Sequence, residues 1–161
     1  MTTYGPFAET SPSGLTGWID ERRRPLADHL RLVLGKLDAA TKFTYTAWRG
    51  PDTGSIVVRR EDVADAFIQA AGSAEAMTVE VRLPGNDGRA RLYTLGRAAR
   101  TGDRTVLVPI SPDRAVRVLP EEIFTADQAA EVFTEFLRTG TVASVYTRRE
   151  LDLSDSQSER R

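Results

Sequence analysis

The sequence predicts an α+β fold, in which a twisted, mostly antiparallel sheet of about six or seven strands carries two or three helices on one face. Alternating apolar and polar residues mark several strands, and short turns join them in pairs, as in antiparallel hairpins. Only three segments show the apolar spacing of a helix. Three helices cannot cover both faces of such a sheet, so we expect one face to contact solvent.

The first 17 residues show no periodicity and are rich in Thr, Ser, Gly and Pro, so we expect an irregular lead-in. A helix should follow near residues 18–37, where apolar side chains recur at helical spacing. A start just before Pro25 is the alternative, because proline suits the first helical turn. A second, shorter helix is expected at 61–71, with Gly72 as its stop.

Residue alternation and turn chemistry together predict the strands. The expected strands lie at residues 41–48, 55–60, 77–83, 90–95, 104–110, 115–119 and 141–147. The first two of them enclose a turn-rich loop at 49–54, and the next four form two further hairpins. We read no internal repeat and no linker between domains in this order of elements.

The best-marked element is a helix that begins after Thr125 and ends at Gly140. Thr125 and Gln128 fit a capping box, in which each side chain binds the other residue's backbone N–H. The apolar residues of this segment form one stripe: Ala129, Val132, Phe133, Phe136 and Leu137. From residue 152 the tail has almost nothing to bury and should be disordered, which leaves a single domain over 18–151.

Composition excludes several classes of function. The 161 residues include no cysteine and one histidine, which excludes thiol nucleophiles, disulfides, iron–sulfur clusters and zinc sites built on cysteine. A net charge of −1 argues against a dedicated nucleic-acid binder. The chain has no apolar run of membrane-spanning length and no secretory signal at its start. We therefore expect a cytoplasmic protein without a membrane or nucleic-acid partner.

The sequence shows no catalytic or cofactor motif. The single histidine, His29, borders the first apolar stripe and is interpreted as a half-buried packing residue. The pairs Asp62 with Asp65 and Asp127 with Glu131 have helical spacing, but no calcium-loop pattern accompanies them. No glycine-rich phosphate loop stands between a strand and a helix. We expect no enzyme activity, no cofactor and no metal site.

Three carboxylates repeat at four-residue spacing along the last predicted helix: Asp127, Glu131 and Glu135. Like charges so placed repel by about 0.2–0.5 kcal/mol per pair. Arginines of the same chain or solvent could neutralise them. Alternatively, they form a docking surface for a basic partner, and we name them as candidate partner-binding residues.

A second candidate surface lies at the end of the strand 41–48. Trp48 and Arg49 belong to the residue types that anchor interfaces, and Asp52 lies in the loop that follows. We name all three as candidate partner-binding residues. The alternative for Trp48 is a plug in the core, and an exposed indole would favour the partner surface.

The segment RAVRVLPEEIFTADQAAEVFTEFLRTGTVASVY resembles the mostly-β Imm-type immunity proteins of bacterial polymorphic toxin systems, which are common in actinobacteria. In that family a strand leads into an "eeA…fl.tG" helix and a short strand, and the stretch from Asp127 to Gly140 matches this shape. The family often ends the strand in tryptophan after a proline, whereas Val142 and Tyr146 stand here.

The resemblance implies a non-enzymatic protein that binds a cognate toxin domain, often a nuclease or deaminase, and blocks its active site. Such an immunity protein or antitoxin-like inhibitor would be a monomer or weak homodimer. The alternatives are a secretion-associated chaperone or adaptor, whose partner would be a secreted client, and an α+β domain that binds a small ligand.

Overall fold

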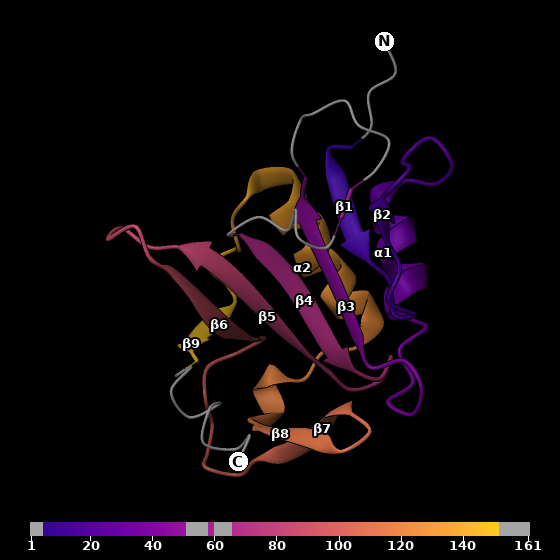
Figure 1. Ribbon diagram of the computed structural model, residues 1–161. Coiled ribbons are helices and arrows are strands. Elements are labelled where there is room, and N and C mark those ends of the chain that lie inside the picture. Colours follow the sequence, from indigo (N-terminus) through magenta and orange to yellow (C-terminus); the bar gives the residue numbers. More distant parts are fainter. Residues whose placement is uncertain (1–4, 51–57, 60–65, 152–161) are drawn as a thin grey trace.

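The computed structural model describes residues 5–50, 58–59 and 66–151 (Figure 1). It has an α+β fold, built on a seven-stranded sheet in which all neighbouring strands are antiparallel. The order across the sheet is β2-β1-β3-β4-β5-β6-β9. Its strands are β1 (Phe7–Thr10), β2 (Thr16–Trp18), β3 (Thr44–Arg49), β4 (Phe67–Gly72), β5 (Met77–Pro84), β6 (Ala90–Gly96) and β9 (Thr147–Glu150).

A second, two-stranded sheet of β7 (Val106–Ser111) and β8 (Arg114–Val118) lies beside one end of the large sheet (Figure 1). A 3₁₀ turn, η2 (Pro120–Glu122), leads from it toward the last helix. The hairpins predicted at 77–95 and 104–119 are therefore confirmed, although the second forms a sheet of its own.

Two helices, α1 (Leu26–Leu34) and α2 (Ala126–Thr139), pack side by side on one face of the large sheet (Figure 1). Their apolar stripes meet the inward-facing strand residues in one core. Its fully buried members include Leu26, Leu30, Leu34, Tyr45, Ile68, Val79, Val81, Leu95, Phe124 and Phe133. Burial of this shared core holds both helices against the sheet.

Both helix boundaries follow from local chemistry. At α2, the Thr125 hydroxyl accepts from Gln128 N at 3.3 Å, and Thr125 N donates to Gln128 Oε1 at 2.9 Å, so the predicted capping box is confirmed. Gly140 ends α2 in the left-handed conformation at φ 75°. α1 begins directly after Pro25, which is its N-cap residue, so the helix starts close to the later of the two expected starts but with the proline just outside its first turn.

Two sequence-based expectations about secondary structure are wrong. Residues 67–72, expected in the helix 61–71 and its glycine stop, form the central strand β4, which pairs with both β3 and β5. Within 1–17, expected to be irregular, β1 and most of β2 belong to the large sheet. In both cases backbone pairing with other strands of the sheet decides the structure, and the pattern within the segment itself does not show that pairing.

Two further strands differ from expectation. The strand expected at 141–147 is displaced to β9, where Arg148 and Arg149 pair with β6. Of the return strand expected at 55–60, the described residues Val58 and Arg59 are not in a strand, and the rest lies outside the described residues. Residues 61–65 of the second expected helix and the tail 152–161 also lie outside the described residues.

The sheet face opposite the helices is polar but only partly open to solvent. Thr78 and Thr94 point to this face and are buried. Near the other end of the sheet, Trp48 packs in a small second cluster with Ala8 and Val58. The expectation of a solvent-exposed face is therefore only partly correct.

Candidate functional site

The exposed side of α2 carries the three carboxylates predicted from the sequence. Asp127, Glu131 and Glu135 are all exposed, while the opposite side of the helix is buried. We call these three residues the acidic face. Within the described ranges, none of them forms an ion pair, and the nearby Arg138 is bound to Glu21 at 3.1 Å. Neutralisation by an arginine of the same chain is thus not seen there.

A shallow groove of about 280 Å³ runs between α1 and α2, beside the acidic face. Its lining residues are Ala27, Arg31, Ala130, Glu131, Thr134 and Glu135. The two alanines leave space between the helices because their side chains are small. Arg31 is held at 2.6 Å by Asp28 on its own helix. The groove therefore combines a small apolar floor with two acidic side chains on the α2 side.

Tyr146 lies near the acidic face on the segment that follows α2. Its ring packs against the core and lies 6.1 Å from the ring of Phe124. Burial, and then the negative charges of Glu131 and Glu135, raise the pKa of its hydroxyl. From the sequence, Tyr146 is expected only as part of the strand 141–147, because no local pattern indicates that it lies near these carboxylates.

Trp48 is not on the surface. Its side chain is only 1% exposed and is packed with Ala8 and Val58, and with the partly buried Trp18 and Phe67. The core alternative is therefore the one that the structure supports for this residue. Among the described residues its indole Nε1 has no hydrogen-bond acceptor, which leaves a buried donor unsatisfied.

Arg49 is exposed but has a structural role. Its guanidinium donates to the carbonyl oxygens of Leu137 at 3.1 Å and Arg138 at 3.3 Å, at the C-terminal end of α2. It also lies 5.5 Å from the centre of the Phe7 ring. A cation at this end of a helix stabilises both the free carbonyl groups and the helix dipole. Asp52 lies outside the described residues.

His29 belongs to a hydrogen-bonded group that sequence reasoning missed. Its Nε2 lies 2.8 Å from Glu9 Oε2, and the same oxygen accepts the hydroxyl of Tyr45 at 2.5 Å. Tyr45 is fully buried, and burial followed by the charge of Glu9 raises the pKa of its hydroxyl well above the usual range. These contacts connect β1, α1 and β3. They were not foreseen because β1 was expected to be irregular.

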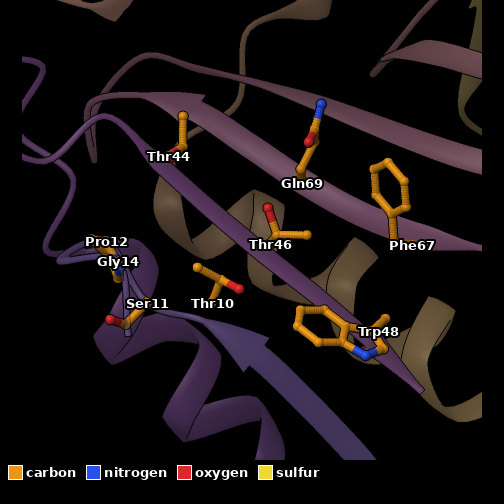
Figure 2. Close-up of a pocket in the computed structure, with 9 residues that line it drawn as sticks. All are labelled: Thr10, Ser11, Pro12, Gly14, Thr44, Thr46, Trp48, Phe67 and Gln69. Atoms are coloured by element: carbon orange, nitrogen blue, oxygen red, sulfur yellow. The ribbon is translucent and has the colours of Figure 1, made fainter. Parts of the chain in front are cut away.

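A cavity of about 260 Å³ lies on the opposite face of the large sheet from the helices (Figure 2). The β1–β2 turn and the strands β3 and β4 form its walls. Its lining residues are Thr10, Ser11, Pro12, Gly14, Thr44, Thr46, Trp48, Phe67 and Gln69. None of these side chains ionises near neutral pH, so they provide hydrogen bonds but no general acid or base.

The described residues provide no clear metal centre. Among them, no group of three or more His, Asp and Glu side chains is placed to hold a metal ion. Asp127 and Glu131 therefore have no third protein ligand there, and Asp62 and Asp65 lie outside the described residues. No helix in this part of the chain is both long enough and apolar enough to cross a membrane.

No family model, curated protein or solved structure matches this chain. The resemblance to immunity proteins therefore rests on the segment from Arg114 to Tyr146 and stays a prediction. The structure places that segment in β8, η2, α2 and the residues just after it.

Proposed function

We propose that this chain is a non-enzymatic, cytoplasmic protein-binding domain, and specifically an immunity or antitoxin-type inhibitor of a cognate toxin domain. The observation that carries the proposal is the acidic face, whose three exposed carboxylates have no ion-pair partner in the described chain. The partner would present a basic surface to α2.

Charge complementarity supports a basic partner. Proteins that act on nucleic acids carry basic surfaces that bind phosphates. Regularly spaced carboxylates on a helix could occupy such a surface and so exclude the substrate. Opposite charges also accelerate encounter between the two proteins and disfavour wrong partners. With a net charge of −1, such attraction must come from this local cluster.

The interhelix groove beside the acidic face supplies a complementary apolar contact. Ala27 and Ala130 lie at its floor, and Glu131 and Glu135 flank it. Protein interfaces commonly combine an apolar centre with a polar rim. The capped ends and buried stripe of α2 hold these side chains on a rigid element, which lowers the entropy lost on binding.

The test uses the protein encoded by the neighbouring gene as the candidate partner. We expect co-expression to yield a complex, and Glu131→Lys with Glu135→Lys to weaken that complex by about 10- to 100-fold in calorimetry, because two favourable charge contacts become repulsive. The weakening should be largest at low ionic strength. Thermal unfolding should show that the variant keeps its fold, since both side chains are exposed.

The matched control is Asp103→Lys with Asp113→Lys. It makes the same change in net charge at two exposed residues outside α2. We expect its affinity to stay close to that of the unmodified protein. Equal weakening by both double variants would assign the effect to overall charge, and unchanged affinity in the α2 variant would remove the acidic face from the interface. Lack of both a complex and protection from toxicity would contradict the proposed function.

A further inference from the structure

One row of polar side chains crosses the large sheet on the face opposite the helices. Each member is the direct cross-strand partner of the next, so the row includes one residue from every strand of this sheet. In spatial order the row is Thr16, Thr10, Thr46, Gln69, Glu80, Thr94 and Arg149. We call it the polar row.

The two halves of the polar row differ in charge. One half ends in an ion pair, in which Arg149 donates to Glu122 at 2.8 and 3.0 Å. The other half contains only hydroxyl and amide groups, and the cavity lies over this half (Figure 2). Thr10, Thr46 and Gln69 belong to both the row and the cavity lining.

Some of the polar groups at the cavity are already occupied. The hydroxyls of Thr10 and Thr16 lie 2.9 Å apart and bind each other. Gln69 Nε2 donates to Glu80 Oε2 at 2.5 Å, which fixes the orientation of the Gln69 amide. Glu80 is partly buried and lies on the neighbouring strand β5, so it holds this amide from within the sheet.

Other polar groups have no partner in the described chain. They are the hydroxyls of Thr44 and Thr46 and the side-chain amide oxygen, Oε1, of Gln69. In Figure 2 the side chains of Thr44, Thr46 and Gln69 stand on the same side of β3 and β4, and the rings of Trp48 and Phe67 lie beside them. Free hydrogen-bonding groups next to aromatic rings are the usual features of a small-molecule site.

We propose that this cavity binds a small, uncharged, ring-shaped molecule with several hydroxyl or amide groups, as in a sugar. Its polar edge would form hydrogen bonds with the hydroxyls of Thr44 and Thr46 and with the side-chain oxygen of Gln69. The partly exposed ring of Phe67 would contact its apolar part, and the buried Trp48 would support the cavity wall from below. A charged ligand is disfavoured, because the lining residues offer no counter-charge to offset its desolvation.

The test is a nuclear magnetic resonance titration with N-acetylglucosamine and glucose as the probes. We expect saturable shifts in the amide signals of Thr44 and Thr46 and in the indole N–H signal of Trp48. A molecule of this size should bind with a dissociation constant of about 1 mM. The charged ring analogues glucuronate and glucosamine should bind at least about tenfold more weakly.

The variant Thr46→Val keeps the side-chain shape and removes one free hydroxyl. We expect it to weaken probe binding by about three- to tenfold, because one hydrogen bond is lost. Thr147→Val is the matched control, since it makes the same change in β9 at the far edge of the sheet. It should bind the probes as the unmodified protein does.

Three results would overturn this proposal: no saturable shift with either neutral probe, equal binding of the charged analogues, or equal affinity of Thr46→Val and Thr147→Val. The cavity and the acidic face lie on opposite faces of the sheet, so either proposal can fail without the other. Loss of toxin binding with intact probe binding would identify failure of the first alone.

Discussion

The surroundings of Glu80 disfavour the ionised form of its carboxyl group. Glu80 lies in the polar row between Gln69 and Thr94 and is partly buried. Burial raises the pKa of its carboxyl group, and this effect outweighs the opposing influence of the Gln69 amide and of Arg149. The negative form of Glu80 therefore costs stability in the folded protein, although Gln69 binds it.

Replacing Glu80 should change how stability depends on pH. A carboxyl group whose pKa is higher in the folded protein than in the unfolded chain destabilises the fold increasingly as pH rises from the unfolded pKa through the folded one. Below both values this penalty is absent. Glu80→Gln keeps a hydrogen-bonding side chain and removes the charge. We expect its free energy of unfolding, relative to the unmodified protein, to be higher at pH 7 than at pH 4.

Urea denaturation at these two pH values measures the difference. Glu75→Gln is the control, because Glu75 is exposed and should show little change in relative stability with pH. A difference between Glu80→Gln and the unmodified protein that is the same at both pH values would show that burial does not perturb Glu80.

Of the candidate site residues, those on the regular helix α2 are the ones whose positions can be predicted from the sequence. Exposure of Asp127, Glu131 and Glu135 follows from the 3.6-residue period and the apolar stripe. Trp48 and Arg49 could not be placed in this way, because their surroundings are built by other segments. Trp48 is covered by neighbours distant in the chain, such as Ala8, and Arg49 binds carbonyl groups at the end of α2.

The start of α2 depends on Thr125, so its replacement should destabilise the element that carries the acidic face. Thr125→Ala removes the hydroxyl that accepts from Gln128 N. We expect a loss of about 1 kcal/mol in the free energy of unfolding, as for other N-cap residues. Thr125→Ser retains the hydroxyl and should stay within about 0.5 kcal/mol of the unmodified protein.

Urea denaturation of both variants compares the two effects. Equal stability of Thr125→Ala and Thr125→Ser would show that the cap contributes nothing measurable. The N-terminal position of α2 is predictable because capping uses residues three apart in the sequence. The contribution of the Thr125 hydroxyl to the stability of α2 can therefore also be predicted from the sequence.

β4 shows why a local pattern can predict the wrong element. Apolar residues at 63, 66, 67 and 70 fit a helical stripe, and the strand also places Ile68 and Ala70 on one face. Short apolar segments are ambiguous between the two periods. The outcome is decided by β3 and β5, which pair with both edges of β4. β1 and β2 likewise gain their structure from pairing in the sheet.

The two sheets meet at Gly72, where there is no room for a side chain. Gly72 has φ 129°, and a Cβ atom there would lie 2.5 Å from the Ala76 carbonyl oxygen and 2.8 Å from Val108 Cγ1. Val108 belongs to β7 and is buried. This glycine therefore allows the small sheet to lie against the end of the large one.

Gly72→Ala should destabilise the fold by about 2–4 kcal/mol, because an unfavourable backbone conformation adds to overpacking. Gly88→Ala is the control: Gly88 also has a positive φ, 80°, but nothing lies within 4 Å of the added Cβ. We expect the control to lose about 1 kcal/mol. Thermal and urea unfolding measure both, and equal losses would show that contact between the two sheets tolerates the added methyl group.

The order of strands in the large sheet also indicates the order in which they pair during folding. Most neighbours in the large sheet are also near neighbours in sequence, so their pairing requires little loop-closure entropy. Two pairs are not close in sequence: β1 and β3 are separated by residues 11–43, and β6 and β9 have the longer separation, residues 97–146, which include the small sheet and α2. Prior folding of these elements shortens the gap that this pairing must close. We therefore expect β9 to pair with β6 late in folding. If β9 detaches from β6, the segment that follows α2 loses its attachment to the sheet, while the central strands stay paired.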